Sequence, residues 1–369
     1  MRVAFFSGCI EYSVCLVNAL CNEVEIDFFY NGDYVRQRDA TILDLLDSRI
    51  NRMEINQYRI RDPKNYLSHR NLARKLREYD IVHVQQGNVW LSMNRHLFKN
   101  VPMVCTVHDP TQHVGLRFAN SYYQHLAQRW IARQSSAFIV HGVKMKAELT
   151  MNFKLHSDLI SVIPHGEFSY YKTWRSENDP LFHAAAGNKR LLFFGEARKN
   201  KGLEYLIRAE PLITEKFKDF TICIAGRFTN EPGNDFAFYA KLMTDPSKYE
   251  IFNRYIANNE VAEIFEQSDI VVLPYVSASQ SGVLALALGF GKPVVATDTG
   301  SIGEVLEHGK TGLLVLPKDP TALANALSEL LINDERLESF GENAVSVAQS
   351  TLSWETIGRQ TTDVYRSLH

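Results

Sequence analysis

The chain has 369 residues, of which 45% are hydrophobic and 22% are charged, and its formal net charge is −2. The length favours two globular domains over one, and the composition is that of chains that bury a core. The near-neutral charge gives no reason to expect nucleic-acid binding, although the mildly basic first half suits an anionic partner or a membrane face, with an ordinary solvated surface as the alternative.

The N-terminal stretch is apolar but interrupted. Ser7, Gly8, Glu11 and Tyr12 break it, so it matches a strand, a loop and a helix better than a signal peptide. No apolar run along the chain approaches the roughly 20 residues that a membrane span needs. We therefore expect a cytoplasmic protein, with the inner face of the cytoplasmic membrane as a further location.

Short apolar runs of strand length alternate with longer helical segments along the whole chain. Such runs are typical of parallel strands that crossover helices bury on both faces. The pattern occurs twice, and it predicts two doubly wound, Rossmann-like α/β domains with a ligand in the cleft between them. The expected strands are Val3–Ser7, Val24–Tyr30, Ile81–Gln85, Pro102–His108, Ala137–His141, Ile160–Pro164, Leu191–Gly195, Thr221–Gly226, Ile270–Pro274, Pro293–Thr297 and Gly312–Val315.

The boundary between the domains is expected near Ser169–Lys189, which lacks periodicity and contains Pro180 and Gly187. The irregular stretch Asp39–Asn71 carries no readable pattern. The last expected helix follows Ser353, an acceptable N-cap. The predicted organisation is a first domain at 1–168 plus about 352–369, a linker at 169–188 and a second domain at 189–351; the expected C-terminal helices are Thr321–Asn333, Glu335–Gln349 and Trp354–His369.

The cysteines predict neither disulfides nor a metal site. Their number, five, is odd, and no CxxC pair occurs. Cys105 and Cys223 lie inside apolar runs, where buried thiols are common. No Cys/His spacing matches a metal-ligand set, so we expect reduced thiols and no bound metal.

The segment Phe194–Leu206, FGEARKNKGLEYL, is the first that carries chemistry. A strand ends at Gly195, and a short loop presents Arg198 and Lys201 where open α/β sheets bind ligands. Two cations at this place could hold a diphosphate, Arg198 in bidentate fashion and Lys201 as a point charge. Since Lys199 is also present, a solvated basic loop is the alternative.

The second such segment is Pro274–Val283, PYVSASQSGV, which leads from a strand into an apolar helix. Ser281, Gly282 and Val283 open that helix, whose free amides and dipole favour an anion. An ordinary N-cap is the alternative.

The order of these motifs resembles the donor domain of retaining glycosyltransferases of the GT-B fold, in particular family 4 (glycosyl transferases group 1), which includes exopolysaccharide and glycolipid assembly enzymes. The motifs are FGxxRxxKG, IAGR, NNEVAEIFEQSDIVVLPY and ASQSGVLALALGFGKPVVATDTGSIGEVLEHGKTGLLV. The resemblance is strong over about residues 188–369, including a closing helix that in that fold crosses back to the first domain. In the first half it rests on Asp80–Gln86, Val104–Pro110 and Val162–Phe168.

The resemblance implies roles for individual residues. Arg198 and Lys201 match the pair that grips the diphosphate. His108 matches a histidine near the transferred sugar, and Asp109 is the alternative catalytic base, whereas the other strand-end histidines, His83, His141 and His165, are expected to be structural. The implied donor-binding residues are Gly8, Gly195, Arg198, Lys201, Gly226, Arg227, Tyr255, Ile256, Gln280, Ser281, Gly282 and Val283.

One departure from the family concerns two glutamates that commonly precede the GxPVVA segment. Ala278 and Leu286 occupy these positions, and no glutamate lies between Glu266 and Glu304. Gln280 could contact the sugar hydroxyls instead. The ribose contact has no assigned residue.

The expected activity is hexose transfer, glucose favoured, from a UDP-sugar to a saccharide or lipid-linked acceptor in polysaccharide biosynthesis. By resemblance the transfer retains configuration, and it uses neither a metal nor any other cofactor. A non-hydrolysing nucleotide-sugar epimerase and a non-catalytic sugar-nucleotide binding subunit are the alternatives; no GxGxxG supports an oxidoreductase. The aromatic, basic stretch Arg117–Arg133 is a candidate membrane contact, with a packed helix as its alternative.

Overall fold

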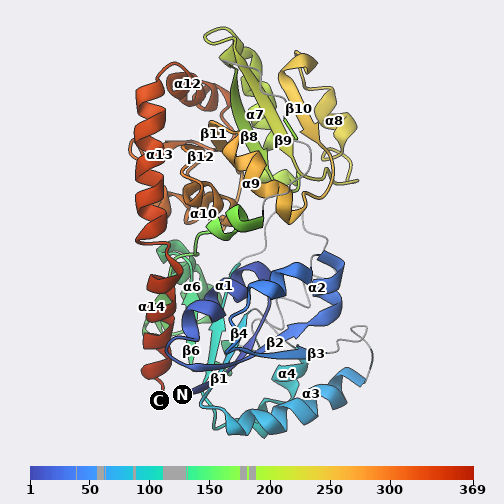
Figure 1. Ribbon diagram of the computed structural model, residues 1–369, viewed down its shortest axis with the longest axis vertical. Helices are drawn as coiled ribbons and strands as arrows, with labels where there is room; N and C mark the ends of the chain where they lie inside the picture. The colour runs from blue at the N-terminus through green and yellow to red at the C-terminus, as the bar shows by residue number, and fades with distance from the viewer. Residues whose placement is uncertain are drawn as a thin grey trace. The chain divides into compact units, whose positions relative to one another are not determined.

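The computed structural model describes residues 1–38, 40–55, 62, 64–85, 89–110, 130, 132–174, 181–182 and 188–369. The chain forms two compact α/β units (Figure 1). Unit 1 comprises Met1–Gln112, Leu116–Gly166 and Ser353–His369, and unit 2 includes Glu167–Leu352. Most of the stretch Arg117–Arg133 lies outside the described residues.

Unit 1 is built on a parallel sheet whose described strands have the order β3-β2-β1-β4-β5-β6-β7. Its chain order switches between β1 and β4, the place where open α/β sheets bind ligands. The strands are β1 (Arg2–Phe6), β2 (Glu25–Asn31), β3 (Asn51–Ile55), β4 (Ile81–Gln85), β5 (Met103–Thr106), β6 (Ala137–Val140) and β7 (Ile160–Val162). The helices described are α1 (Ile10–Leu20), α2 (Gly32–Arg38), α3 (Lys64–Lys75), α4 (Val89–Met93), α6 (Val143–Phe153) and α14 (Trp354–Arg366), with 3-10 turns η1 (Ala40–Leu45), η2 (Leu76–Glu78), η3 (Arg95–Leu97) and η4 (Ser157–Leu159).

Unit 2 repeats the design with the strand order β10-β9-β8-β11-β12-β13, again all parallel. The strands are β8 (Lys189–Phe194), β9 (Phe220–Ala225), β10 (Tyr249–Phe252), β11 (Ile270–Leu273), β12 (Val294–Thr297) and β13 (Gly312–Val315). The helices are α7 (Leu203–Thr214), α8 (Phe236–Ala240), α9 (Asn258–Glu266), α10 (Gly282–Gly289), α11 (Ile302–Val305), α12 (Pro320–Leu331) and α13 (Asp334–Gln349), with 3-10 turns η5 (Ser169–Trp174), η6 (Lys199–Lys201) and η7 (Pro246–Lys248). The two doubly wound domains expected from the sequence are therefore confirmed.

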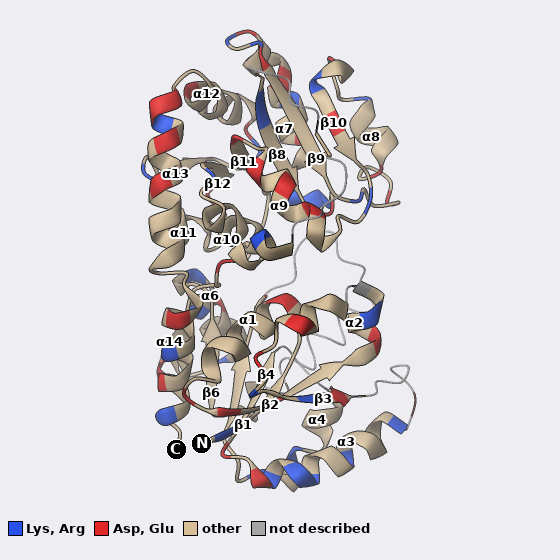
Figure 2. Cartoon of the chain, in the orientation of Figure 1, with Lys and Arg blue, Asp and Glu red and all other residues tan. Residues whose placement is uncertain are grey.

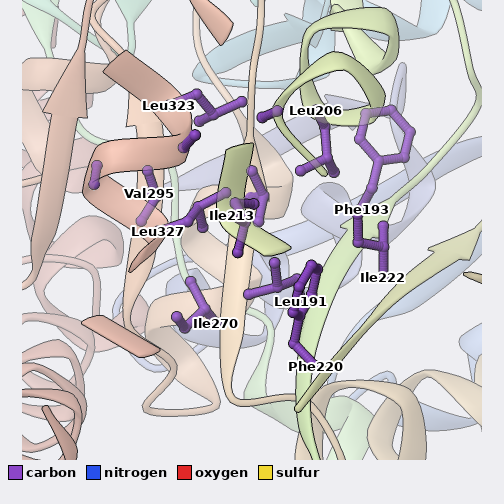
Figure 3. Packing of buried hydrophobic residues seen from close by; sticks show 14 of the residues in the cluster. Leu191, Phe193, Leu206, Ile213, Phe220, Ile222, Ile270, Val295, Leu323 and Leu327 are labelled. Atoms are coloured by element: carbon purple, nitrogen blue, oxygen red, sulfur yellow. The ribbon is translucent and has the colours of Figure 1, made fainter. Parts of the chain in front are cut away.

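The core of unit 2 lies between its sheet and helices α7 and α12. Figure 3 shows Leu191 and Phe193 of β8 and Ile270 of β11 among the side chains that meet Leu206 of α7 and Leu327 of α12, all of them buried. Burial of such side chains stabilises a fold by about 25 cal/mol per Å² of apolar surface. The loops described below follow the ends of these buried strands.

The C-terminal helix α14 belongs to unit 1, where it packs on α1. The Ser353 side chain caps it by accepting a hydrogen bond from the Thr356 amide at 3.2 Å, as the sequence predicts. Gly358 faces Ala19 of α1 so closely that a Cβ would lie 2.8 Å from the Ala19 methyl group. The expected return of this helix to the first domain is confirmed.

The fold departs from the sequence-based expectation at the sheet edges and in Asp39–Asn71. That stretch, expected to be irregular, contains β3 and the start of α3, and β10 was not predicted. Both strands lie at an edge of their sheet, and neither is fully buried, so neither shows the continuous apolar run of a central strand. Helix α3 buries polar Asn65 and His69, which hides its amphipathic pattern.

No helix in the described part of the chain is long and apolar enough to cross a membrane. Acidic and basic residues both occur on α13 and α14 (Figure 2).

Candidate functional site

The main candidate site of unit 2 lies where the loops after β8 and β11 meet. Asn200 joins them: its carbonyl accepts a hydrogen bond from the Val276 amide at 2.8 Å, and its side-chain amide donates to the Ser277 carbonyl at 3.2 Å. Because β8 and β11 are neighbouring parallel strands, both loops leave the same edge of the sheet. The two motifs singled out in the sequence therefore come together.

Glycines make the close approach of these loops possible. Gly226, after β9, has φ +151°, and a Cβ there would lie 2.0 Å from the Gly195 carbonyl oxygen. Gly202 has φ +65°, and a Cβ would lie 1.9 Å from the Pro274 carbonyl oxygen. Only glycine fits such positions without strain. Gly195 itself has φ +105° and faces open space.

Arg198 and Arg227 share one carboxylate, that of Glu196. Arg198 donates from Nε to Glu196 Oε2 at 2.8 Å, and Arg227 donates from Nη2 to Oε1 at 3.1 Å. Partial burial opposes the charged form, but the hydrogen bonds from Arg227 and Arg198 prevail and lower the pKa of Glu196. Both guanidinium groups remain at least half exposed, so they can also reach an incoming anion. The sequence analysis did not identify Glu196, although it lies inside the FGEAR motif.

Lys201 is linked to Ser281 through Tyr275. The Lys201 ammonium lies 3.8 Å from the centre of the Tyr275 ring, and the Tyr275 hydroxyl lies 3.3 Å from Ser281 Oγ. Tyr275 is buried, and its carbonyl accepts a hydrogen bond from the Thr297 hydroxyl. Tyr275 thus contacts both the Lys201 ammonium and the N-cap residue of α10, a role that the PYV sequence alone did not signal.

The start of α10 has the form of an anion site. Ser281 is its N-cap and accepts a hydrogen bond from the Leu284 amide at 3.1 Å. In the part of the chain that the structure describes, no group accepts a hydrogen bond from the amides of Gly282 and Val283. Unpaired amides at a helix start attract negative charge.

Apolar residues, Ala278 and Leu286, occupy the two positions where the family commonly has glutamates. Leu286 is buried, and the Ala278 carbonyl lies against Gly300. Beside them, Gln280 Oε1 is buried without a hydrogen-bond partner among the described residues. The same holds for the hydroxyls of Thr299 and Ser301 in the loop after β12. Buried acceptors and donors left unpaired in this way are costly unless a ligand or water satisfies them.

Tyr255 and Ile256 follow the edge strand β10. The Tyr255 side chain is exposed, whereas Ile256 is buried. Arg254 and Glu260 form an ion pair of 2.5 Å that fixes this loop at the start of α9. A hydrogen bond from the Gly226 amide to the Phe252 carbonyl ties it to the loop after β9.

In unit 1, Gly8 lies between the ends of β1 and β4. Its amide donates to Gln85 Oε1 at 3.3 Å, and a Cβ on Gly8 would lie 2.5 Å from the Gln85 carbonyl oxygen. Ser13 also donates to Gln85 Oε1, at 2.6 Å. Gly8 is thus explained by a close approach of two loops, and Gln85 is a residue that the sequence analysis missed.

His108 lies beyond the end of β5 in a buried group of aromatic rings. Its ring centre is 4.9 Å from that of Tyr12 and 4.8 Å from that of His141. Burial, with smaller effects of His165 and His83, lowers the pKa of His108 to about 3. Asp109 follows directly and is half-buried.

The other histidines singled out in the sequence have structural partners, although His83 lies inside β4 and not at its end. His83 contacts the Thr106 hydroxyl at 2.7 Å and the Tyr365 hydroxyl of α14. His165 Nδ1 lies 2.9 Å from the Gly166 carbonyl oxygen. No group of three or more His, Cys, Asp or Glu side chains in the described ranges is arranged to hold a metal ion.

Comparison with known families matches both units. Residues 12–166 match the model for "Glycosyltransferase Family 4", and residues 188–333 match the model for "Glycosyl transferases group 1". The chain is 25% identical over 301 residues to the uncharacterized glycosyltransferase MJ1607 of Methanocaldococcus jannaschii, covering 78% of this chain and 75% of that protein. It is 26% identical over 299 residues to a glycogen synthase of Mycobacterium tuberculosis, with 78% and 68% covered.

A solved structure shares the whole fold. The crystal structure of Anabaena Alr3699/HepE in complex with UDP-glucose superposes with a TM-score of 0.75 at 17% sequence identity, and all of both chains is covered. This likeness concerns the two Rossmann-like domains and their order.

Proposed function

We propose that this chain, which has the GT-B fold and matches a family 4 model followed by a group 1 model, is a glycosyltransferase that transfers a hexose from a UDP-sugar to a saccharide or lipid-linked saccharide. UDP-glucose is the proposed donor, and the transfer is proposed to retain configuration at the anomeric carbon. No metal or other cofactor takes part in the proposed reaction. Polysaccharide assembly at the inner face of the cytoplasmic membrane is the proposed setting.

The observation that carries this proposal is the convergence of cations and free amides at one sheet edge of unit 2. Arg198 and Arg227 meet at Glu196, and the Lys201 ammonium lies over the ring of Tyr275, whose hydroxyl contacts the N-cap residue of α10. A nucleoside diphosphate leaving group develops negative charge as the glycosidic bond of the donor breaks. Fixed positive groups stabilise that charge most when they are in place before the reaction.

Glu196 gives the site a resting state. It pairs with both arginines. We propose that a diphosphate takes over these hydrogen bonds on binding, because an arginine fork matches phosphate as well as carboxylate. Gln280, with its unpaired Oε1, is proposed to accept a hydrogen bond from a sugar hydroxyl.

The donor proposal is supported by the Anabaena structure with UDP-glucose. Contact with the donor is proposed for the remaining residues from their place in the family pattern: Gly8, Gly195, Gly226, Tyr255, Ile256, Ser281, Gly282 and Val283. His108 is proposed to act at the transferred sugar, with Asp109 as the alternative base.

The test is a binding and turnover experiment on the purified protein. Thermal shifts with UDP-, GDP- and ADP-glucose would rank the donors, and UDP release would then be measured with and without a saccharide acceptor extract, in buffer containing EDTA. We expect the largest shift with UDP-glucose and UDP release that depends on acceptor. Consumption of a UDP-sugar without acceptor would favour the epimerase alternative, and binding without any turnover would favour the non-catalytic subunit.

A further inference from the structure

Three buried histidines lie together because three neighbouring parallel strands end side by side. His108 follows β5, His141 follows β6 and His165 follows β7, and these strands are adjacent in the sheet. The ring centres of His108 and His141 are 4.8 Å apart, and those of His141 and His165 are 5.3 Å apart. Tyr12 of α1 packs against all three rings, and Trp354 of α14 packs against Tyr12.

The hydrogen bonds of His141 determine where its proton lies. Its Nδ1 is 3.0 Å from the carbonyl oxygen of Ile163, and a carbonyl oxygen can only accept. The Nδ1 atom of His141 must therefore carry the proton. In a neutral imidazole the other nitrogen, Nε2, is then an acceptor.

The same reasoning passes to His108. His141 Nε2 lies 2.9 Å from His108 Nδ1, so His108 must donate from Nδ1 to make this bond. The remaining nitrogen of His108, Nε2, then has a free lone pair. It is buried, and it has no hydrogen-bond partner in the described part of the chain.

We propose that His141 is a positioning residue that fixes the proton of His108 on Nδ1, so that His108 Nε2 accepts a hydrogen bond from a sugar hydroxyl of the substrate. The inference rests on the proposed function for the nature of that substrate. A site of this polarity selects for a group that can donate, and it selects against a carbonyl or an anion, which can only accept. Sites built to pair with a hydroxyl discriminate strongly against analogues that lack it.

Burial supports the neutral form of both rings. It lowers the pKa of His108 to about 3, and it lowers the pKa of His141 far below its ordinary value, although Asp109 opposes the shift of His141. The hydrogen bonds from Ile163 through His141 to His108 form a relay that needs both rings neutral. An additional proton on either ring would break it, because both nitrogens of that ring would become donors.

The first experiment determines the tautomers directly. Protein labelled with 15N-histidine would be examined near neutral pH, without substrate, by long-range 1H–15N correlation, which distinguishes protonated from unprotonated ring nitrogens. Spectra of H108Q and H141Q would assign the two rings among the 12 histidines. We expect Nδ1 protonated and Nε2 unprotonated in His108. A proton on His108 Nε2 in the wild-type protein would overturn the inference.

The second experiment separates positioning from packing. His141→Leu removes the acceptor, and it should release His108 to the other tautomer and lower kcat by about 10- to 100-fold, the range typical for loss of an orienting partner. His141→Gln can still accept from His108 and donate to Ile163, and it should keep most of the activity. Equal losses in the two variants would contradict a hydrogen-bonding role. His69→Leu, which removes a buried histidine on α3, is the matched control and should leave kcat/KM unchanged.

Donor analogues locate the hydroxyl. Fluorine in place of one glucose hydroxyl of UDP-glucose cannot donate a hydrogen bond. If one such analogue loses kcat/KM with the wild type but not with His108→Ala, that hydroxyl belongs to the donor. If His108→Ala leaves all analogues in the wild-type order and weakens only acceptor use, it belongs to the acceptor. Wild-type protein that transfers no glucose would refute the proposed function. The tautomer spectrum tests the protonation of His108 whether or not the protein transfers glucose.

Discussion

Replacing Lys201 by alanine tests the proposed charge stabilisation at its sharpest point. In the resting protein the Lys201 ammonium contacts the Tyr275 ring at 3.8 Å, an interaction that contributes only about 0.5–2 kcal/mol. A preorganised group that stabilises charge in a transition state contributes more, about 2.7–4 kcal/mol. We therefore expect Lys201→Ala to lower kcat by at least about 100-fold, while the free energy of unfolding falls by no more than about 2 kcal/mol.

The assay is steady-state UDP release from UDP-glucose with acceptor, accompanied by thermal melts of each variant. Lys199, exposed in the same 3-10 turn, provides the matched control: Lys199→Ala removes an equal charge two residues away and should leave kcat nearly unchanged. Equal effects of the two variants would indicate a general electrostatic field. A folded Lys201→Ala protein with wild-type kcat would remove Lys201 from the mechanism.

Three further predictions follow from the geometry. Glu196→Gln removes the charge that pairs with the two arginines, and it should raise the affinity for UDP by up to about fivefold in isothermal titration, because a partly exposed ion pair contributes less than about 1 kcal/mol. Weaker UDP binding would show instead that Glu196 supports the site. Gly226→Ala should lower the free energy of unfolding by about 1–3 kcal/mol and weaken UDP binding, because Gly226 has φ +151° and lies against the Gly195 carbonyl. The control Gly233→Ala should leave UDP binding intact, because Gly233 has φ +80° but faces open space. Burial lowers the folded-state pKa of His83 and His108 to about 3, below the unfolded value, so the free energy of unfolding should be highest above about pH 6.5 and should fall by about 1.4 kcal/mol per pH unit for each histidine as the pH drops toward 3. Urea unfolding between pH 7 and 4 measures this slope, and a flat profile would contradict the prediction.

The sequence predicted the central strands well because these strands are buried on both faces. Runs such as Ile270–Pro274 contain little besides β-branched and aliphatic residues, and only a buried parallel strand explains them. The edge strands β3 and β10 escaped because a strand exposed on one side carries charges that a loop would also carry. Seven of the eleven expected strands also ran one or two residues past the end of the observed strand, into the loop that follows it.

The sequence predicted the cations of the candidate site, but it did not predict the residues that contact them. Arg198 and Lys201 stand at a strand end, and that position alone suggested an anion. Glu196 and Tyr275 lie in the same motifs, but their roles depend on contacts between loops 30 to 80 residues apart along the chain, which spacing does not reveal. The relay from Ile163 to His141 depends on the registration of β6 with β7 for the same reason.

The two units place polar groups at the same kind of sheet edge, yet they prepare it in opposite ways. In unit 2 Arg198 and Arg227 are charged, exposed and held by the Glu196 carboxylate, so the edge suits an anion that can displace a carboxylate. In unit 1 His108 and His141 are neutral and buried. The Ile163 carbonyl fixes the proton of His141, and His141 Nε2 fixes the proton of His108, so His108 Nε2 suits an uncharged hydroxyl. A diphosphate has the first chemistry, and a sugar hydroxyl has the second. For the proposed UDP-sugar donor, Ala278 and Leu286 offer no carboxylate, so we expect discrimination among sugars to depend on hydroxyl geometry more than on charge.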